Sequence, residues 1–274
     1  MSTVKHRLVT CMQVRGNLGK STVLGALAQY CDQRDVPWRG FDLDTDHRSF
    51  SRQFPEYVSL RELGDEPEGE IIKLARGCAE VPVTIVDPRA HIADKVLRGL
   101  EMIKFPQNFA NEGGRISVLL FPGDDLEMLT DIDALVSRLG DSVDYVVVRN
   151  PARQPRCRMF QGSELERDLV RMGAVTLEVP TLLAMARNHL AALEVELGRG
   201  VTHVEAVANR ELALDGMVRM VVEDWAKTLF RRFDGVAGNL LPTVYAAKVT
   251  SVDTAPHVDV PSPKRGAKMN YRDL

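Results

Sequence analysis

Four consecutive residues, Gly19-Lys20-Ser21-Thr22, combine the groups that bind a phosphate: a flexible backbone, an ammonium and two hydroxyls. They end the stretch MQVRGNLGKST at residues 12–22. If a helix begins here, the backbone N–H groups of residues 16–21 would surround a β-phosphate, because free amides and the helix dipole both favour an anion. Lys20 would reach the β- and γ-phosphates, and Ser21 would bind Mg²⁺. The stretch therefore predicts a nucleotide site.

The segments on either side have the pattern that such a loop needs. A short apolar strand is expected at 7–14, before the loop. An amphipathic helix is expected at 20–34, after it, with an apolar face that includes Val23, Leu24 and Leu27. A strand, a glycine-containing turn and a helix in this order are the context that separates a phosphate loop from a chance match.

Carboxylates follow two further apolar strands. Asp42 and Asp44 lie in FDLDTDHRSFS, and Asp87 ends VTIVD. A carboxylate at the end of a parallel strand can reach the Mg²⁺ shell, which is the role we expect for Asp87. Asp44 has two interpretations: it orients attacking water near the γ-phosphate, or it caps a polar turn.

The strands and helices alternate along the first two thirds of the chain. The expected strands are 7–14, 38–43, 81–87, 116–121, 145–150 and 174–179. Helical segments are expected at 20–34, 91–104, 125–139 and 161–172. Most strands are continuously apolar, as in strands covered on both faces. The alternation predicts an α/β fold with a doubly wound, mostly parallel sheet flanked by helices.

The last third is expected to be helical and then irregular. From 184 to 233 the pattern is helical only, and one long helix has a packing face. That face is made of Leu214, Met217, Val218, Val221, Val222, Trp225 and Leu229. Periodicity is lost after Pro242, where three prolines follow. We therefore expect one domain at 1–242 and a flexible tail at 243–274.

Composition limits the class of protein. The 274 residues carry a net charge of −3, so no global field draws the chain to nucleic acid or membrane. Four cysteines lie far apart without a CxxC pair, which argues against a zinc site and fits a reducing cytoplasm. No apolar run is long enough to span a bilayer, and the N-terminus lacks a signal-peptide cleavage site. We expect a cytoplasmic protein.

The loop resembles the deviant Walker A motif, KGGxGK[ST], of the ParA/MinD family of P-loop ATPases. That motif has no glycine where Val14 stands in this chain. On this alignment Arg15 takes the place of the signature lysine, Gly16 matches the first glycine and Asn17 replaces the second. Leu18 fills the variable position, and Gly19 to Thr22 match directly. Arginine keeps the charge and adds a fork for phosphate, and asparagine tolerates a positive φ better than most residues.

The resemblance implies roles for further residues. Arg15 would reach across a homodimer to the partner's nucleotide, and Asp44 would position the attacking water. Asn150, after the fifth expected strand, would hydrogen-bond adenine, and Pro180 would lie in the base-contacting loop. The family commonly has D-x-P at the strand end, whereas here Pro88 follows Asp87 directly, so the geometry of that loop is expected to differ.

The resemblance implies an ATPase that binds ATP and Mg²⁺, dimerises with ATP and positions DNA or another cargo in plasmid partition or conjugation. A partner protein would stimulate its slow hydrolysis. Non-specific DNA would bind basic residues near the C-terminus, namely Arg231, Arg232, Lys248, Lys264, Arg265 and Lys268.

Four other classes remain to be weighed. A MinD-like membrane anchor would need a basic amphipathic C-terminal helix, which the proline-interrupted tail does not provide. A small-molecule kinase or ligase on the same fold would need a second-substrate pocket, and a nucleotide-binding protein would show little or no hydrolysis. An iron protein would need a cysteine pair spaced to bridge a cluster, and the chain has none.

Overall fold

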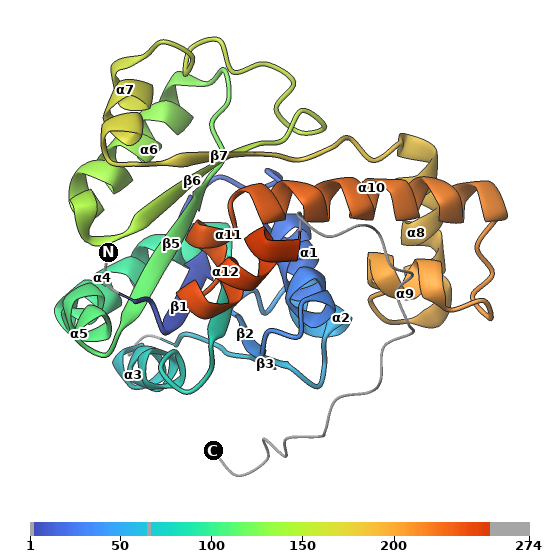
Figure 1. The fold of residues 1–274 in the computed structure, drawn as a ribbon, viewed down its shortest axis with the longest axis horizontal. Helices are drawn as coiled ribbons and strands as arrows, with labels where there is room; N and C mark the ends of the chain where they lie inside the picture. The colour runs from blue at the N-terminus through green and yellow to red at the C-terminus, as the bar shows by residue number, and fades with distance from the viewer. Residues whose placement is uncertain (1–2, 65–66, 253–274) are drawn as a thin grey trace.

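A single parallel sheet forms the centre of the molecule. The computed structural model describes residues 3–64 and 67–252, and its seven strands lie in the order β3-β2-β4-β1-β5-β6-β7 (Figure 1). Every neighbouring pair is parallel. The strands are β1 (His6–Thr10), β2 (Trp38–Asp42), β3 (Val58–Leu60), β4 (Val83–Asp87), β5 (Gly114–Leu120), β6 (Asp144–Arg149) and β7 (Val175–Glu178).

The predicted sheet is confirmed, with one addition. Each of the six expected strands is present, and the apolar residues of β1, β4 and β5 are buried as two-sided covering requires. The added strand is β3, at the edge of the sheet, of which only Val58 is buried. A strand this short carries no apolar pattern, so its place is fixed by pairing with β2 rather than by its sequence.

Two groups of helices flank the sheet (Figure 1). In the first group α1 contacts β4, α10 contacts both α1 and β7, and α11 contacts β6. In the second group α5 contacts β5, and α4 contacts α3 and α5. The helices of the first half are α1 (Lys20–Gln33), α2 (Ser49–Gln53), α3 (Glu68–Gly77), α4 (Ala93–Met102), α5 (Phe105–Asn111) and α6 (Leu126–Leu139). Those of the second half are α7 (Glu164–Arg171), α8 (Ala184–Leu197), α9 (His203–Ala208), α10 (Gly216–Gly235), α11 (Ala237–Leu240) and α12 (Thr243–Val252).

The long helix expected near the C-terminus is α10. It extends past the sheet to α8 and α9, which lie at one end of it (Figure 1). Val218, Val222 and Leu229 are buried as predicted, but Met217 is 64% exposed, so its assignment to the packing face is wrong. Met217 lies in the first turn, about 100° around the helix from Val218, where the side chain leaves the apolar face.

The expected boundary at Pro242 is followed by a helix. α12 occupies Thr243–Val252, the first ten residues of the segment that we expect to be a tail. The backbone N–H of Thr243 donates to the Val4 carbonyl, and α12 contacts α10 and α11, so the packed body extends beyond residue 242. Residues 253–274, with Lys264, Arg265 and Lys268, lie outside the described residues. Across the described ranges, none of the helices combines the length and apolar character that a bilayer span requires.

Candidate functional site

The phosphate loop lies between β1 and α1, at the carboxyl end of the central strand. β1 ends at Thr10, and α1 begins at Lys20. Gly19 has φ 87° and Asn17 has φ 60°, so both adopt left-handed backbone conformations on either side of buried Leu18. The expected tolerance of Asn17 for a positive φ is therefore what this loop requires. Such alternation of backbone conformations turns successive N–H groups toward one point, where an anion can bind.

Lys20 folds back over the loop. Its ammonium donates to the carbonyl of Gln13 at 2.7 Å and to that of Arg15 at 3.1 Å, and the residue is only 8% exposed. An ammonium has three N–H donors, so these two contacts leave one for a ligand. The loop thus surrounds the Lys20 ammonium, the group that would bind a phosphate.

Gln13 supports this arrangement and was not among the predicted site residues. Its amide N–H donates to the Phe121 carbonyl at 3.2 Å, and its amide oxygen accepts from the Phe121 N–H at 2.6 Å. These bonds join the end of β1 to the end of β5 just before the loop begins. The signal in the sequence is a polar residue at the end of an apolar run, which is too common to identify such a contact.

Ser21 and Asp87 meet where the Mg²⁺ site is predicted. Asp87 is the last residue of β4 and only 3% exposed. The pKa of its carboxyl is raised to about 7, mainly by burial and also by the charges of Asp42 and Asp44, although a hydrogen bond from Ser21 and the charge of Lys20 oppose the shift. A buried carboxyl held against neighbouring acids is stabilised by a cation.

Ser21 and Asp87 fit a magnesium site that the substrate completes. In the described part of the chain no group of three or more acidic, histidine or cysteine side chains is arranged to hold a metal. Mg²⁺ commonly uses one or two protein ligands together with phosphate oxygens and water. A hydroxyl and one carboxylate beside a phosphate loop match that donor set.

Asp42 organises the loop after β2. It pairs with Asp87 in the sheet register and is fully buried. One carboxylate oxygen accepts from the Asp44 N–H at 3.0 Å, and the other accepts from the N–H and hydroxyl of Ser51 at 2.8 and 2.9 Å. Asp42 is therefore satisfied by its own chain and holds the start of α2 to the sheet.

Asp44 caps a turn in this structure. Its carboxylate accepts from the backbone N–H groups of Asp46 and His47, each at 3.1 Å. Asp46, in the same turn, forms an ion pair with Arg89 from the loop after β4. The loop that carries Asp44 is thereby joined to the loop that follows Asp87, a contact that the sequence could not indicate.

Arg15 points away from the loop and toward the first turn of α6. Its guanidinium lies 2.5 Å from the Asp125 carboxylate and 3.8 Å from that of Glu127, and its side chain is 45% exposed. Asp125 is also the N-cap of α6, where it accepts from the N–H groups of Glu127 and Met128. Within one chain, Arg15 is therefore paired with acids and not with the loop.

Asn150 lies against the phosphate loop. It follows β6 and is buried, and its amide donates to the Leu18 carbonyl at 3.0 Å. A Cβ placed on Gly19 would come within 2.4 Å of the Asn150 amide nitrogen, so this loop position has room for glycine alone. The amide of Asn150 thus holds the loop in place, a role additional to the base contact that the resemblance implies.

Pro180 lines a cavity of about 380 Å³ close to Asn150. The Pro180 carbonyl accepts from the indole N–H of Trp225 at 2.6 Å, which ties the end of β7 to α10. The walls come from the loop after β6, the end of β7 and α10. The lining residues are Arg149, Pro151, Gln154, Pro155, Cys157, Gln161, Glu178, Val179, Pro180, Thr181, Thr228 and Arg232.

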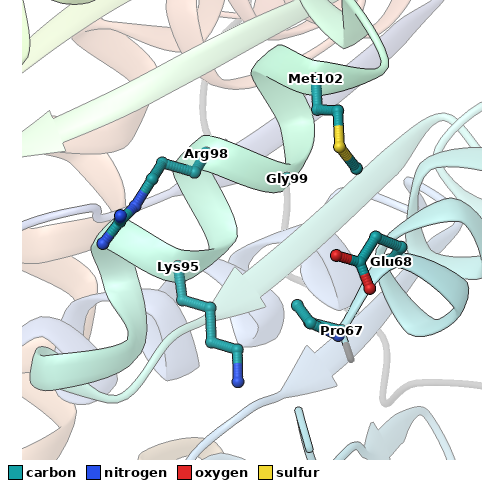
Figure 2. A pocket seen from close by; sticks show the side chains of 6 residues that line it. All are labelled: Pro67, Glu68, Lys95, Arg98, Gly99 and Met102. Atoms are coloured by element: carbon teal, nitrogen blue, oxygen red, sulfur yellow. The ribbon is translucent and has the colours of Figure 1, made fainter. Parts of the chain in front are cut away.

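A second cavity of about 380 Å³ lies between α3 and α4 and includes none of the predicted site residues. Figure 2 shows that Arg98 points away from Glu68 across this space. Arg98 pairs with Asp94, and the Lys95 ammonium donates to the Gly64 carbonyl. Both cations that line this cavity are therefore paired within the chain, and the cavity offers no free cation to a ligand.

The three described residues among those predicted for DNA are divided between two helices. Arg231 and Arg232 are exposed on α10, where Arg231 donates to Thr228 and Arg232 lies 3.9 Å from Glu178. Lys248 on α12 lies over the ring of Tyr245, 5.3 Å from its centre. None of these contacts is short enough or buried enough to prevent binding to an anion.

The strand order and the strand–loop–helix arrangement of β1 and α1 are those of a P-loop NTPase fold. No protein-family model matches the sequence. No curated protein matches it either.

Several solved structures are similar in fold. A ParA family ATPase from Chlorobium tepidum TLS is 14% identical with a TM-score of 0.47, covering 82% of this chain and 99% of its own. The MinD cell division protein of Aquifex aeolicus, in complex with MinC, is 12% identical with a TM-score of 0.46, covering 82% and 96%. The signal recognition particle receptor FtsY from Elizabethkingia anophelis is 13% identical with a TM-score of 0.46, covering 81% and 65%. At these identities the likeness concerns the fold alone.

Proposed function

We propose that the chain is a ParA-like ATPase that binds ATP with Mg²⁺ and acts as an ATP-dependent dimer switch in the cytoplasm. The observation that carries the proposal is the meeting of three groups at the carboxyl ends of β1 and β4. The Lys20 ammonium, the Ser21 hydroxyl and the buried Asp87 carboxylate are close enough to interact, as the pKa of Asp87 reflects. A phosphate chain is the ligand that uses all three.

Each residue has a proposed part in binding. Backbone N–H groups of Gly16 to Thr22 surround the β-phosphate, and Lys20 exchanges a loop carbonyl for a phosphate oxygen. Ser21 and Asp87 hold Mg²⁺, which neutralises charge on the β- and γ-phosphates. The adenine occupies the cavity beside Pro180, with Asn150 at its inner end.

Hydrolysis is proposed to be slow in the isolated chain. Asp44 must exchange its two backbone contacts before it can orient water, and its turn is held to the β4 loop through Asp46 and Arg89. A partner protein that moves this turn would stimulate hydrolysis. The proposed cargo is DNA, as in plasmid partition or conjugation.

Arg15 is proposed to act across the dimer. Within one chain its guanidinium pairs with Asp125 and not with the phosphate loop, and its side chain remains 45% exposed. An arginine supplied by a second subunit can stabilise the charge that develops during phosphoryl transfer. The dimer would exchange the Asp125 contact for the partner's nucleotide.

The first test is nucleotide binding by the full chain, measured with a fluorescent ATP analogue and Mg²⁺. We expect Lys20→Ala to weaken binding by at least about 100-fold, a loss typical of a charged hydrogen bond to phosphate together with its orientation. Lys73→Ala, at an exposed lysine on α3, is the matched control and should bind like the wild type. Equal binding by the Lys20→Ala variant and the wild type would contradict the proposal.

The second test is molar mass by light scattering with Mg²⁺ and either ATP or ADP. A dimer that forms with ATP alone and is lost in Arg15→Ala supports the switch. A monomer with every nucleotide, together with phosphate release from ATP only when a small molecule is added, would favour the kinase or ligase alternative. Tight ATP binding without phosphate release would favour a nucleotide-binding protein with little or no hydrolysis. The hydrogen bonds that the Asp44 carboxylate accepts within its own turn agree with that alternative.

A further inference from the structure

The loop between β6 and α7 is strongly basic. Residues 149–162, RNPARQPRCRMFQG, contain four arginines and no acid, although the chain as a whole has a net charge of −3. Arg153, Arg156 and Arg158 are all exposed. Within residues 3–64 and 67–252, their guanidinium groups have no ion pair or hydrogen bond, whereas nearby Arg149 pairs with Glu166.

The backbone of this loop is held in place, although the side chains of Arg153, Arg156 and Arg158 are not. Phe160 is fully buried, and the N–H of Met159 donates to the Asp124 carboxylate at 3.1 Å. The thiol of Cys157 donates to the Pro122 carbonyl at 3.3 Å. At the start of the loop the Asn150 carbonyl accepts from two following N–H groups. A fixed backbone loses less entropy on binding than a flexible segment, so its charges contribute more to affinity.

The loop also lies beside the nucleotide site. The Cγ of Arg153 is 3.8 Å from a Cβ placed on Gly19 of the phosphate loop. The cavity lined by Pro151, Gln154 and Cys157 is closed on its other side by Thr228 and Arg232 of α10. The cations of the loop therefore continue onto α10, and a ligand on this surface would lie next to the bound nucleotide.

We propose that the surface formed by Arg153, Arg156 and Arg158 binds the sugar–phosphate backbone of duplex DNA without sequence preference. Three guanidinium groups within six residues provide the repeated phosphate contacts that non-specific binding needs. Arginine forks match phosphate oxygens in pairs. The proposal rests on the proposed function for the choice of DNA as partner, but it assigns the contact to this loop rather than to the C-terminal residues.

An anionic membrane fits the same surface less well. Binding to a lipid surface normally combines basic residues with a broad apolar face that enters the acyl boundary. Met159 is the one large apolar side chain that the described loop residues expose, since Phe160 is buried. Charge without an apolar face favours a hydrated polyanion.

The test uses the full chain with ATP and Mg²⁺ and labelled DNA duplexes of two unrelated sequences, with binding followed by fluorescence anisotropy. Arg156→Ala/Arg158→Ala leaves Arg153, which lies near the phosphate loop, unchanged. We expect this variant to lose at least about tenfold in affinity for both duplexes, and the slope of log K against log salt to fall by about 2. The matched control is Arg76→Ala/Arg210→Ala, which removes two exposed arginines elsewhere and should retain wild-type binding and slope.

Two further variants separate this surface from the alternatives. Arg156→Lys/Arg158→Lys keeps the charge, so it should retain the slope and most of the affinity. Lys264→Ala/Arg265→Ala/Lys268→Ala should have the smaller effect on DNA. The proposal is overturned if the tail variant loses binding while Arg156→Ala/Arg158→Ala does not, if control and loop variants lose equally, or if the protein binds vesicles containing phosphatidylserine but not DNA.

ATP binding measured on the same samples distinguishes this inference from the proposed function. An Arg156→Ala/Arg158→Ala protein that binds ATP normally but has lost DNA supports both, and it also shows that the variant is folded. ATP binding by the wild type without any DNA binding overturns the loop surface and leaves the ATPase. DNA binding through the loop without ATP binding keeps the surface and overturns the ATPase.

Discussion

For Arg15, the chemistry of the side chain suggests a role, but neighbouring side chains determine where it lies. Its charge next to the glycines suggested a phosphate contact, whereas the structure pairs it with Asp125 and Glu127. An exposed ion pair contributes about 0–1 kcal/mol, so a phosphate could displace these acids. The pairing is therefore compatible with the proposed movement of Arg15 to a partner.

Asp125→Asn is predicted to favour the ATP-bound dimer. The amide keeps the N-cap acceptor of α6 but removes the charge that holds Arg15. We expect the dimer dissociation constant with ATP to fall by up to about fivefold for each released pair, as an exposed ion pair allows. Light scattering or ultracentrifugation measures it. Asp125→Ala releases Arg15 equally but should cost about 1 kcal/mol of stability through the lost cap. A weaker dimer in both variants would contradict the prediction.

Asp87 gives the protein a predicted pH dependence without nucleotide. Burial raises the pKa of its carboxyl in the folded state to about 7, above the ordinary aspartate value of 3.8, so the folded protein holds a proton that the unfolded chain has lost between these pH values. The free energy of unfolding should therefore decrease as the pH rises from about 4 to about 7 and change little from this group above that. Denaturant unfolding in EDTA measures the slope.

Asp87→Asn is the control for that slope. An uncharged amide removes the titrating group, so the decrease between about pH 4 and pH 7 should become smaller in the variant. Addition of Mg²⁺ and ATP to the wild type should also reduce it, because a cation keeps the carboxylate ionised. An identical slope in wild type and variant would show that other groups cause the pH dependence.

The phosphate loop illustrates what neighbouring elements impose on a motif. Asn150 follows β6, more than a hundred residues from the loop, yet its amide binds the Leu18 carbonyl and occupies the space beside Gly19. The glycine is needed for two reasons, its φ of 87° and the 2.4 Å approach of Asn150 to any Cβ. The motif predicts the first reason, and only packing supplies the second.

A double-variant cycle should separate these two reasons. Gly19→Ala is expected to cost about 2–4 kcal/mol, from a strained backbone and a clash. Asn150→Ala should cost about 1 kcal/mol through the lost hydrogen bond. Because Asn150→Ala also removes the clash, the double variant should be less destabilised than the sum of the single variants. Urea unfolding of the four proteins measures the difference, and strict additivity would rule out the steric contact.

Among the elements, the central strands were predictable and the small ones were not. β1, β4 and β5 are continuous apolar runs, and two-sided burial leaves that signature in any sequence. β3 and α2 have one buried side chain each, so tertiary contacts decide their form. Helix α12 was missed because its residues have almost no amphipathic pattern, and its contacts with α10 and α11 stabilise it instead.

At the scale of the molecule, α10 joins α1 and the edge of the sheet at β7 to the helices α8 and α9. Asp234 near its end accepts from the Tyr30 hydroxyl at 2.7 Å and from the Arg34 guanidinium at 2.7 Å through both oxygens, and both donors belong to or follow α1. Burial and the Asp234 charge both raise the pKa of Tyr30. This connection fixes the helix that begins at the phosphate loop against the rest of the protein.

Asp234→Ala is predicted to destabilise the whole domain by about 2–3 kcal/mol, because it removes charged hydrogen bonds and leaves a buried hydroxyl unpaired. Tyr30→Phe, which removes one bond and keeps the ring contacts with Phe230 and Phe233, should cost about 1 kcal/mol. Thermal and denaturant unfolding measure both. A loss below about 0.5 kcal/mol for Asp234→Ala would contradict this role.

The sequence by itself determined the parallel sheet and the glycine-containing loop between β1 and α1, and it predicts Lys20, Ser21 and Asp87 as site residues. These follow from local patterns: apolar runs, a glycine before a helix and acids at strand ends. The tertiary structure alone decided that Arg15 pairs with Asp125, that Asn150 holds the loop, and that Asp46 joins Arg89. Those contacts join residues far apart in the chain, and the packing of the strands, not any local pattern, brings them together.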